Sequence, residues 1–178
     1  NALTNDGTLK VTATKSANVG TFVGSGTVDI ANNKALTLNQ SGDSTYSGIF
    51  QNSGTLNKTG GGILTLTGDS TQSGGLNVQA GTIDTTSGGT LADTNDVVVS
   101  SGANYIVGAT DTIQSLDNTG TSTLNADLTT TGSITNNNTG TVDINATTTV
   151  QDAFTNNSGG TINQDGNLSV TNALTNNG

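Results

Sequence analysis

The last third of the chain repeats itself every 20 residues, and this period constrains the fold more than any other feature of the sequence. Apolar residues recur at fixed steps, and so do Asn and Gly-Thr pairs. The apolar positions that share a register are Ile134, Phe154 and Leu174, then Val142 and Ile162, then Val150 and Val170. The amide positions are Asn136, Asn156 and Asn176. Residues 118–178 are therefore the most regular part of the chain.

Each period contains three short β-prone bursts, separated by Asn and Gly clusters. In the burst 141–145, apolar and polar residues alternate, which places one set of side chains inside and the other in solvent. One coil of three such strands cannot bury its apolar side chains alone, but stacking on an identical coil does so. The pattern predicts an all-β parallel β-helix with coils of about 20 residues. Stacked Asn amides are expected to bond from coil to coil, as a ladder at Asn136, Asn156 and Asn176.

Upstream of residue 118 the period is looser, yet related Gly-Thr phrases recur, so residues 1–178 are predicted to form a single β-helix segment of 8–9 coils. Protruding loops are expected in 85–96 or 108–112. The first seven residues nearly repeat the last seven, as if each were a coil cut in mid-pattern. We interpret the sequence as an excerpt of a longer repeat array.

The composition argues against several classes of function. There is no Cys, His, Arg or Glu, which leaves no disulfide, common zinc site or Ser–His–Asp nucleophile. With four Lys and a net charge of −9, binding to nucleic acid is not expected, and no stretch is apolar enough for membrane insertion. The pair Asp93 and Asp96 is the nearest approach to two catalytic carboxylates, and a solvated loop explains it better. We therefore predict no enzyme activity, no cofactor and no metal site.

Residues 36–83 carry a resemblance to a known family. The glycine-rich run 60–68 and the segment 69–83 that follows it resemble the autotransporter-associated β-strand repeat of autotransporter passengers and large bacterial surface adhesins. The resemblance implies a right-handed parallel β-helix that is secreted across the outer membrane and displayed at the cell surface. It implies less about activity, because one fold serves many functions.

The leading hypothesis is a non-catalytic structural stalk or scaffold of a secreted or surface-displayed fibre or adhesin, such as an extracellular or biofilm filament. Its partners would be neighbouring coils of the same longer chain, or head-to-tail copies of itself. The alternative is a binding module whose side face or loops contact glycans or a host protein. Tyr46 and Tyr105 are the candidate surface contacts of such a module, since sugars favour aromatic platforms.

Overall fold

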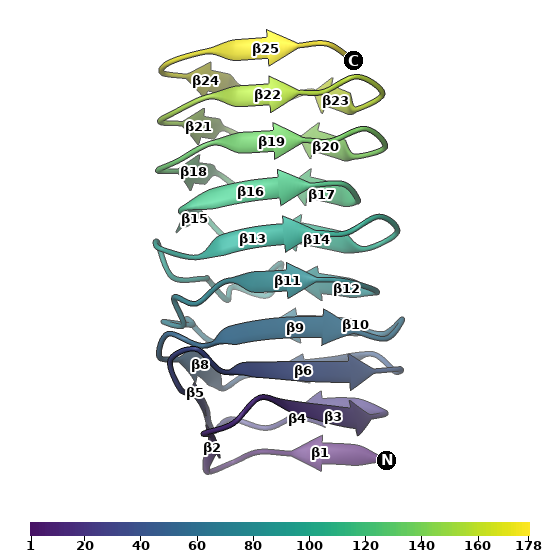
Figure 1. Cartoon of the computed structure of the whole chain (residues 1–178), viewed down its shortest axis with the longest axis vertical. Coiled ribbons are helices and arrows are strands. Elements are labelled where there is room, and N and C mark those ends of the chain that lie inside the picture. The colour runs from purple at the N-terminus through teal and green to yellow at the C-terminus, as the bar shows by residue number, and fades with distance from the viewer.

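The computed structural model describes residues 1–178 as 25 strands in nine stacked coils, with no helix. Figure 1 shows the coils rising from the N-terminus to the C-terminus with a right-handed turn. The predicted all-β parallel β-solenoid with coils of about 20 residues is confirmed. Every strand pairing is parallel, because each strand lies beside the strand one coil later.

Each complete coil contributes one strand to each of three sheets. Sheet 1 is continuous through all nine coils: β3 (Lys15–Val19), β6 (Ala35–Gln40), β9 (Thr55–Thr59), β11 (Leu76–Val78), β13 (Asp96–Val99), β16 (Ser115–Asn118), β19 (Ile134–Asn136), β22 (Phe154–Asn156) and β25 (Leu174–Asn176). Sheet 2 follows it along the chain: β1 (Ala2–Thr4), β4 (Thr21–Val23), β7 (Ser44–Tyr46), β10 (Ile63–Leu66), β12 (Thr82–Asp84), β14 (Asn104–Val107), β17 (Thr121–Leu124), β20 (Thr141–Ile144) and β23 (Thr161–Gln164). A single bridge between Gly24 and Tyr46 joins the first two strands of sheet 2 to the other seven.

Sheet 3 is interrupted. Its lower part holds β2 (Thr8–Val11), β5 (Thr27–Ile30) and β8 (Ile49–Gln51), and its upper part holds β15 (Asp111–Ile113), β18 (Leu128–Thr130), β21 (Thr148–Val150) and β24 (Leu168–Val170). Two coils between these parts have no strand in sheet 3, and residues 67–75 and 85–95 cross that side as loops. The loop expected in 85–96 is thus found. The alternative site at 108–112 is wrong, because Asp111 and Ile113 point inward and begin a strand.

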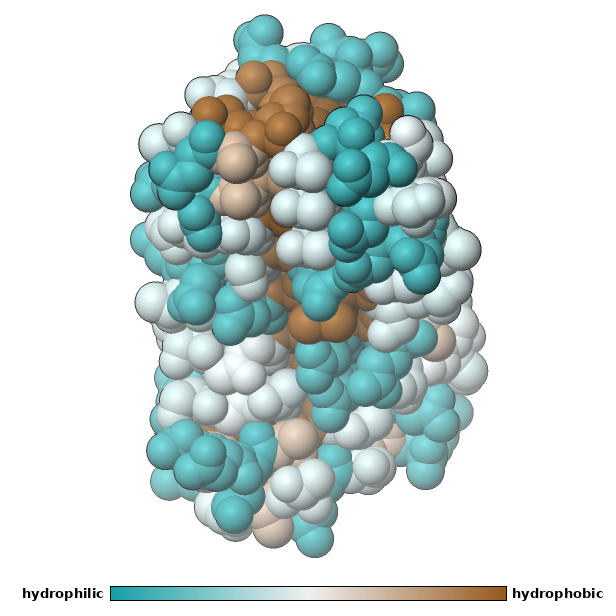
Figure 2. Space-filling view, turned by 45° about the horizontal axis from the view of Figure 1, so that its top comes forward, coloured by the Kyte–Doolittle hydropathy of each residue, from teal (hydrophilic) through white to brown (hydrophobic).

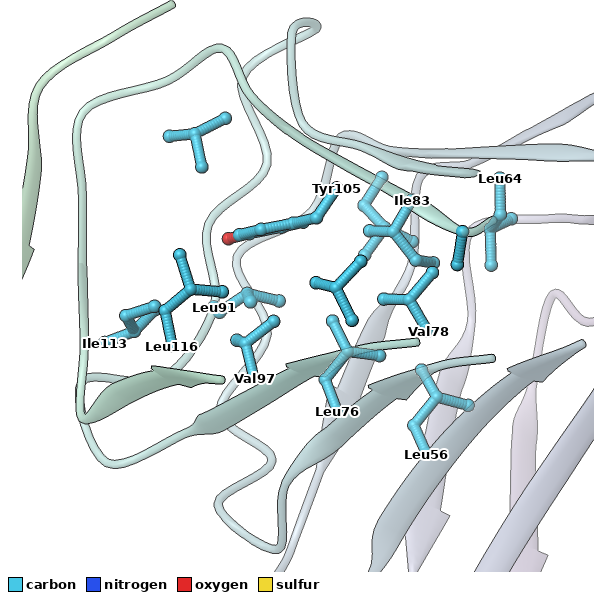
Figure 3. Close-up of a cluster of buried hydrophobic side chains, with 14 of the residues drawn as sticks. Leu56, Leu64, Leu76, Val78, Ile83, Leu91, Val97, Tyr105, Ile113 and Leu116 are labelled. Carbon is cyan, nitrogen blue, oxygen red and sulfur yellow. The ribbon is translucent and has the colours of Figure 1, made fainter. Parts of the chain in front are cut away.

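The core is a thin column of 29 buried apolar residues. Strands such as β20 alternate half-buried and buried positions, so every second side chain enters the column. Figure 3 shows the middle of this column, where side chains from opposite sheets point toward one another. In sheet 1, Leu56, Leu76, Val97 and Leu116 lie one above another in register, and in sheet 2 Leu64, Ile83 and Tyr105 do the same. Full burial of one such aliphatic side chain contributes about 1.5–3 kcal/mol.

The 20-residue register of the C-terminal coils is present in the structure. Ile134 pairs with Phe154 and Phe154 with Leu174, and the same step relates Val142 to Ile162 and Val150 to Val170. In the looser coils upstream the step changes with the corners, so Tyr105 of β14 already pairs with Ser122 of β17. Corners of different length are tolerated there because they leave the strand pairing intact.

Candidate functional site

An internal amide ladder runs along the corner where sheet 1 turns into sheet 2. The Nδ2 atoms of Asn118 and Asn136 donate to the Oδ1 of the Asn one coil above, each at 2.8 Å, and Asn156 does the same to Asn176. Asn136 and Asn156 also donate to the carbonyls of Gly140 and Gly160 at 3.0 Å. The ladder thus spans four coils and begins at Asn118, one coil before the predicted members.

The ladder satisfies backbone groups that the corner turns inward. An unpaired carbonyl in a dry column costs about 1–3 kcal/mol, so the inward carbonyls of these corners need a donor. Asn supplies two N–H donors and one acceptor, which is enough to serve its own corner and accept from the coil below. The Asn residues are therefore structural groups that bind the coils together.

Lys58 occupies the same column further down. Sheet 1 pairing runs from Asn118 to Val99, then to Val78, then to Lys58. Its side chain is fully buried, and the Nζ atom donates to carbonyls of the corner. The sequence analysis did not single out this residue. Strand alternation indicates its inward position, because Leu56 and Lys58 are two residues apart in one strand and therefore point to the same side.

Outside the column, many Asp residues begin side-wall ladders. Asn137 donates to Asp117, Asn163 donates to Asp143, and Asn172 donates to Asp152 one coil below. In these pairs the Asp lies on the N-terminal side and the Asn on the C-terminal side. Hydrogen bonds from Asn172 and Ser133 lower the pKa of Asp152. These carboxylates are therefore engaged in hydrogen bonds between coils.

A buried carboxylate closes the gap in sheet 3. Asp111, with an exposed fraction of 6%, accepts from the backbone N–H of Leu91 at 3.0 Å and from that of Thr112 at 2.9 Å. The pKa of Asp111 is raised to about 6, chiefly because burial disfavours the charged carboxylate. The two hydrogen bonds lower the pKa, and the charges of Asp93 and Asp69 raise it. Through Leu91 the carboxylate ties strand β15 to the loop of the coil below, which has no strand in sheet 3.

Neither predicted aromatic contact is exposed, so the expectation for Tyr46 and Tyr105 is wrong. Both tyrosines take inward positions of sheet 2 strands and have an exposed fraction of 0%. Tyr46 packs on Phe22 and Phe50, with ring centroids 4.4 and 5.3 Å away, and its hydroxyl donates to the Gly26 carbonyl at 2.7 Å. The Tyr105 hydroxyl makes no hydrogen bond, and burial raises its pKa well above the usual value. Period-two alternation of the strands places both tyrosines in the core.

Apolar side chains are uncovered at the C-terminal end of the column. Figure 2 shows brown side chains gathered at the end that is turned toward the viewer. Leu174 has an exposed fraction of 56%, whereas Phe154, its partner one coil below, has 0%. Ile162, Leu168 and Val170 are only partly buried against the same core. This end of the column, the stacking surface of the last coil, is therefore apolar and accessible to solvent.

The side walls hold no pocket, and no three acidic side chains converge as a metal ion would require. Asp93 is exposed in the 85–95 loop, and Asp96, at the start of β13, accepts from Ser115 Oγ. Both carboxylates are exposed to solvent.

These features define the chain as a parallel β-solenoid of repeated coils. Residues 56–84 match the family model of the passenger-associated-transport-repeat, a repeat of autotransporter passengers. The match overlaps residues 36–83, whose sequence resembles such passengers, and extends one residue beyond them. Comparisons with curated proteins and with solved structures find no match. No helix in the structure is long and apolar enough to cross a membrane.

Proposed function

We propose that this chain is a non-catalytic stalk or scaffold segment of a secreted or surface-displayed bacterial protein. The observation that carries the proposal is the use of its polar side chains. Amides and carboxylates that would serve a ligand site elsewhere are bonded between coils, inside the column and along the side walls. The passenger repeat at 56–84 supports the location, since such repeats occur in autotransporter passengers.

A stalk should tolerate a change of length. Residues 141–160 form one complete coil, and the dipeptide Gly140-Thr141 is repeated as Gly160-Thr161. Removal of this coil therefore joins Gly140 to Thr161 and restores the same Gly-Thr dipeptide. Under the proposal, the shortened chain folds, Asn136 bonds directly to Asn176, and the long dimension falls by about 4.8 Å. Small-angle scattering with far-UV circular dichroism measures both. Unfolding on removal of one coil would contradict a modular stalk.

The interruption of sheet 3 favours a second candidate, a binding module that contacts glycans or a host protein through its loop. Residues 86–88 are exposed at the tip of the 85–95 loop. Exchange of these three residues for others would abolish partner binding by cells that display the protein if the loop is the contact. Removal of coil 141–160 is the matched control, because it leaves this loop unchanged.

The stacking surface of the last coil also supports self-association. Residues 1–58 hold all four Lys and three Asp, whereas residues 59–178 hold the other ten Asp, so opposite ends differ in charge. We expect the exposed Leu174 to stack on a neighbouring coil, of the same longer chain or of a second copy. Sedimentation velocity over a range of concentrations tests the second case. Leu174→Asp should abolish concentration-dependent growth, and a wild-type chain that stays monomeric throughout would overturn head-to-tail stacking.

A further inference from the structure

The ammonium group of Lys58 lies inside the column among backbone carbonyls. Its Nζ donates to the carbonyl oxygens of Thr59 at 3.0 Å, Gly60 at 2.9 Å and Ala80 at 3.4 Å. Thr59 is the last residue of strand β9 and Gly60 follows it, whereas Ala80 lies just after strand β11 one coil above. The cation therefore ties two successive coils together, and its hydrogen-bond partners are all backbone carbonyls. Asp43 is the charged group that acts on it, through its field.

The walls of this site are built from glycines that hold conformations other residues avoid. Gly60 and Gly81 have φ values of 76° and 71°, in the left-handed region. A Cβ atom on Gly81 would lie 2.4 Å from the Gly60 carbonyl oxygen and 2.9 Å from Lys58 Nζ. The two glycines let the backbone approach the ammonium closely, so the chain shapes a polar cradle at this corner.

The corners above show what such a cradle requires. Asn118, Asn136 and Asn156 hold the same column position as Lys58, and each donates from Nδ2 to a glycine carbonyl of its corner. Lys58 therefore supplies donors where no Asn ladder exists. It differs from Asn in one respect, because its donors belong to a charge with no hydrogen-bond acceptor of its own.

We propose that the corner formed by Thr59, Gly60 and Ala80 is a carbonyl site for a monovalent, ammonium-type cation, which the protein fills with its own tethered Lys58. Clustered carbonyl oxygens can replace the hydration shell of a monovalent cation without any carboxylate. Burial lowers the pKa of Lys58 to about 8, and below that pH the group remains charged. The site is distinct from the amide ladder and from the proposed stacking surface.

Removal of the Lys58 side chain leaves the carbonyl site empty, so that added cations can be tested in it. Lys58→Ala deletes three carbons and the ammonium, and n-propylammonium restores the same atoms. We expect Lys58→Ala to melt at a lower temperature than wild type in NaCl. n-Propylammonium chloride at equal ionic strength should recover at least half of the lost melting temperature in a saturable manner, and KCl should recover less. Tetramethylammonium has no N–H donor and exceeds the space, so it should recover nothing.

Two variants serve as controls. Lys58→Met fills the volume without a donor, and we expect its lower melting temperature to show no response to n-propylammonium. Lys10→Ala removes an exposed lysine and should respond to no cation specifically. A Lys58→Ala protein as stable as wild type, or one that gains equally from every salt, would overturn the proposal.

Wild-type protein gives an independent measurement if Lys58→Ala fails to fold. Exposed lysine ammonium protons exchange too fast for detection near pH 7, whereas buried, bonded ones are protected. In a proton–nitrogen correlation spectrum of the four lysines, we expect one persistent ammonium signal at neutral pH, and Lys58→Met should remove it. A spectrum without a persistent signal would show that the cradle does not hold the cation.

Discussion

The amide ladder allows a stability experiment whose magnitude follows from the contacts. The Asn136 Nδ2 group shares its two hydrogens among the Asn156 Oδ1 at 2.8 Å and the carbonyls of Gly140 and Thr161 at 3.0 Å each. Asn136→Ala removes these donors and leaves the buried Asn156 oxygen without its donor. The lost bond to a carbonyl is worth about 1 kcal/mol, and the unpaired oxygen costs about 1–3 kcal/mol. We expect the free energy of unfolding to fall by about 2–4 kcal/mol.

Asn137→Ala is the matched control. Asn137 is the next residue and is half-buried, and its side chain bonds along the outer wall to Asp117 and Asn157. Substitution there should cost about 0.5 kcal/mol or less, as is usual for surface positions. Urea unfolding followed by far-UV circular dichroism measures both variants, with an unchanged m-value as the check on two-state analysis. Equal losses for Asn136→Ala and Asn137→Ala would refute the reasoning, because the inner ladder would then have no special role.

Three further variants test other parts of the column. Phe154→Ala empties a fully buried site and should cost about 3–5 kcal/mol in the same urea assay, a value that a column able to collapse would not reach. Gly81→Ala forces a Cβ to 2.4 Å from the Gly60 carbonyl at φ 71°, and thermal melting should show a loss of more than about 1 kcal/mol. The raised pKa of Asp111, about 6 in the folded state, means that the folded chain binds the extra proton between about pH 4 and 6. Its stabilising contribution is therefore present below about pH 4 and is lost as the pH rises through 6, and Asp111→Asn should remove this slope from the pH dependence of melting.

The solenoid and its register were predictable because apolar residues and Asn residues both recur every 20 positions in residues 118–178. Pairing of Ile134, Phe154 and Leu174 needs only that period and strand alternation. The gap in sheet 3 was predictable only as an irregular stretch in 85–96. How the chain closes that gap depends on a contact between residues 20 positions apart, Leu91 and Asp111, which no local pattern reveals.

The wrong prediction for the two tyrosines and the omission of Lys58 share one physical cause. Composition treats a tyrosine or a lysine in a polar chain as a surface residue, but strand alternation decides the side on which it lies. Tyr46, Tyr105 and Lys58 all hold inward positions of their strands. The Tyr46 hydroxyl and the Lys58 ammonium have hydrogen-bond partners there, whereas the Tyr105 hydroxyl has none. Strand alternation alone predicts an inward side chain at all three positions.

The gap in sheet 3 has a mechanical consequence. Tension along the axis of the solenoid is shared by the hydrogen bonds between adjacent coils, which act in parallel across all three sheets. In Figure 1 the coils that contain β11 and β13 show no strand of sheet 3. Fewer regular bonds resist separation there, and the Asp111 carboxylate stands in for part of them. Under a steady pull, rupture should therefore start at this level, and the regular coils above Asn118 should separate last.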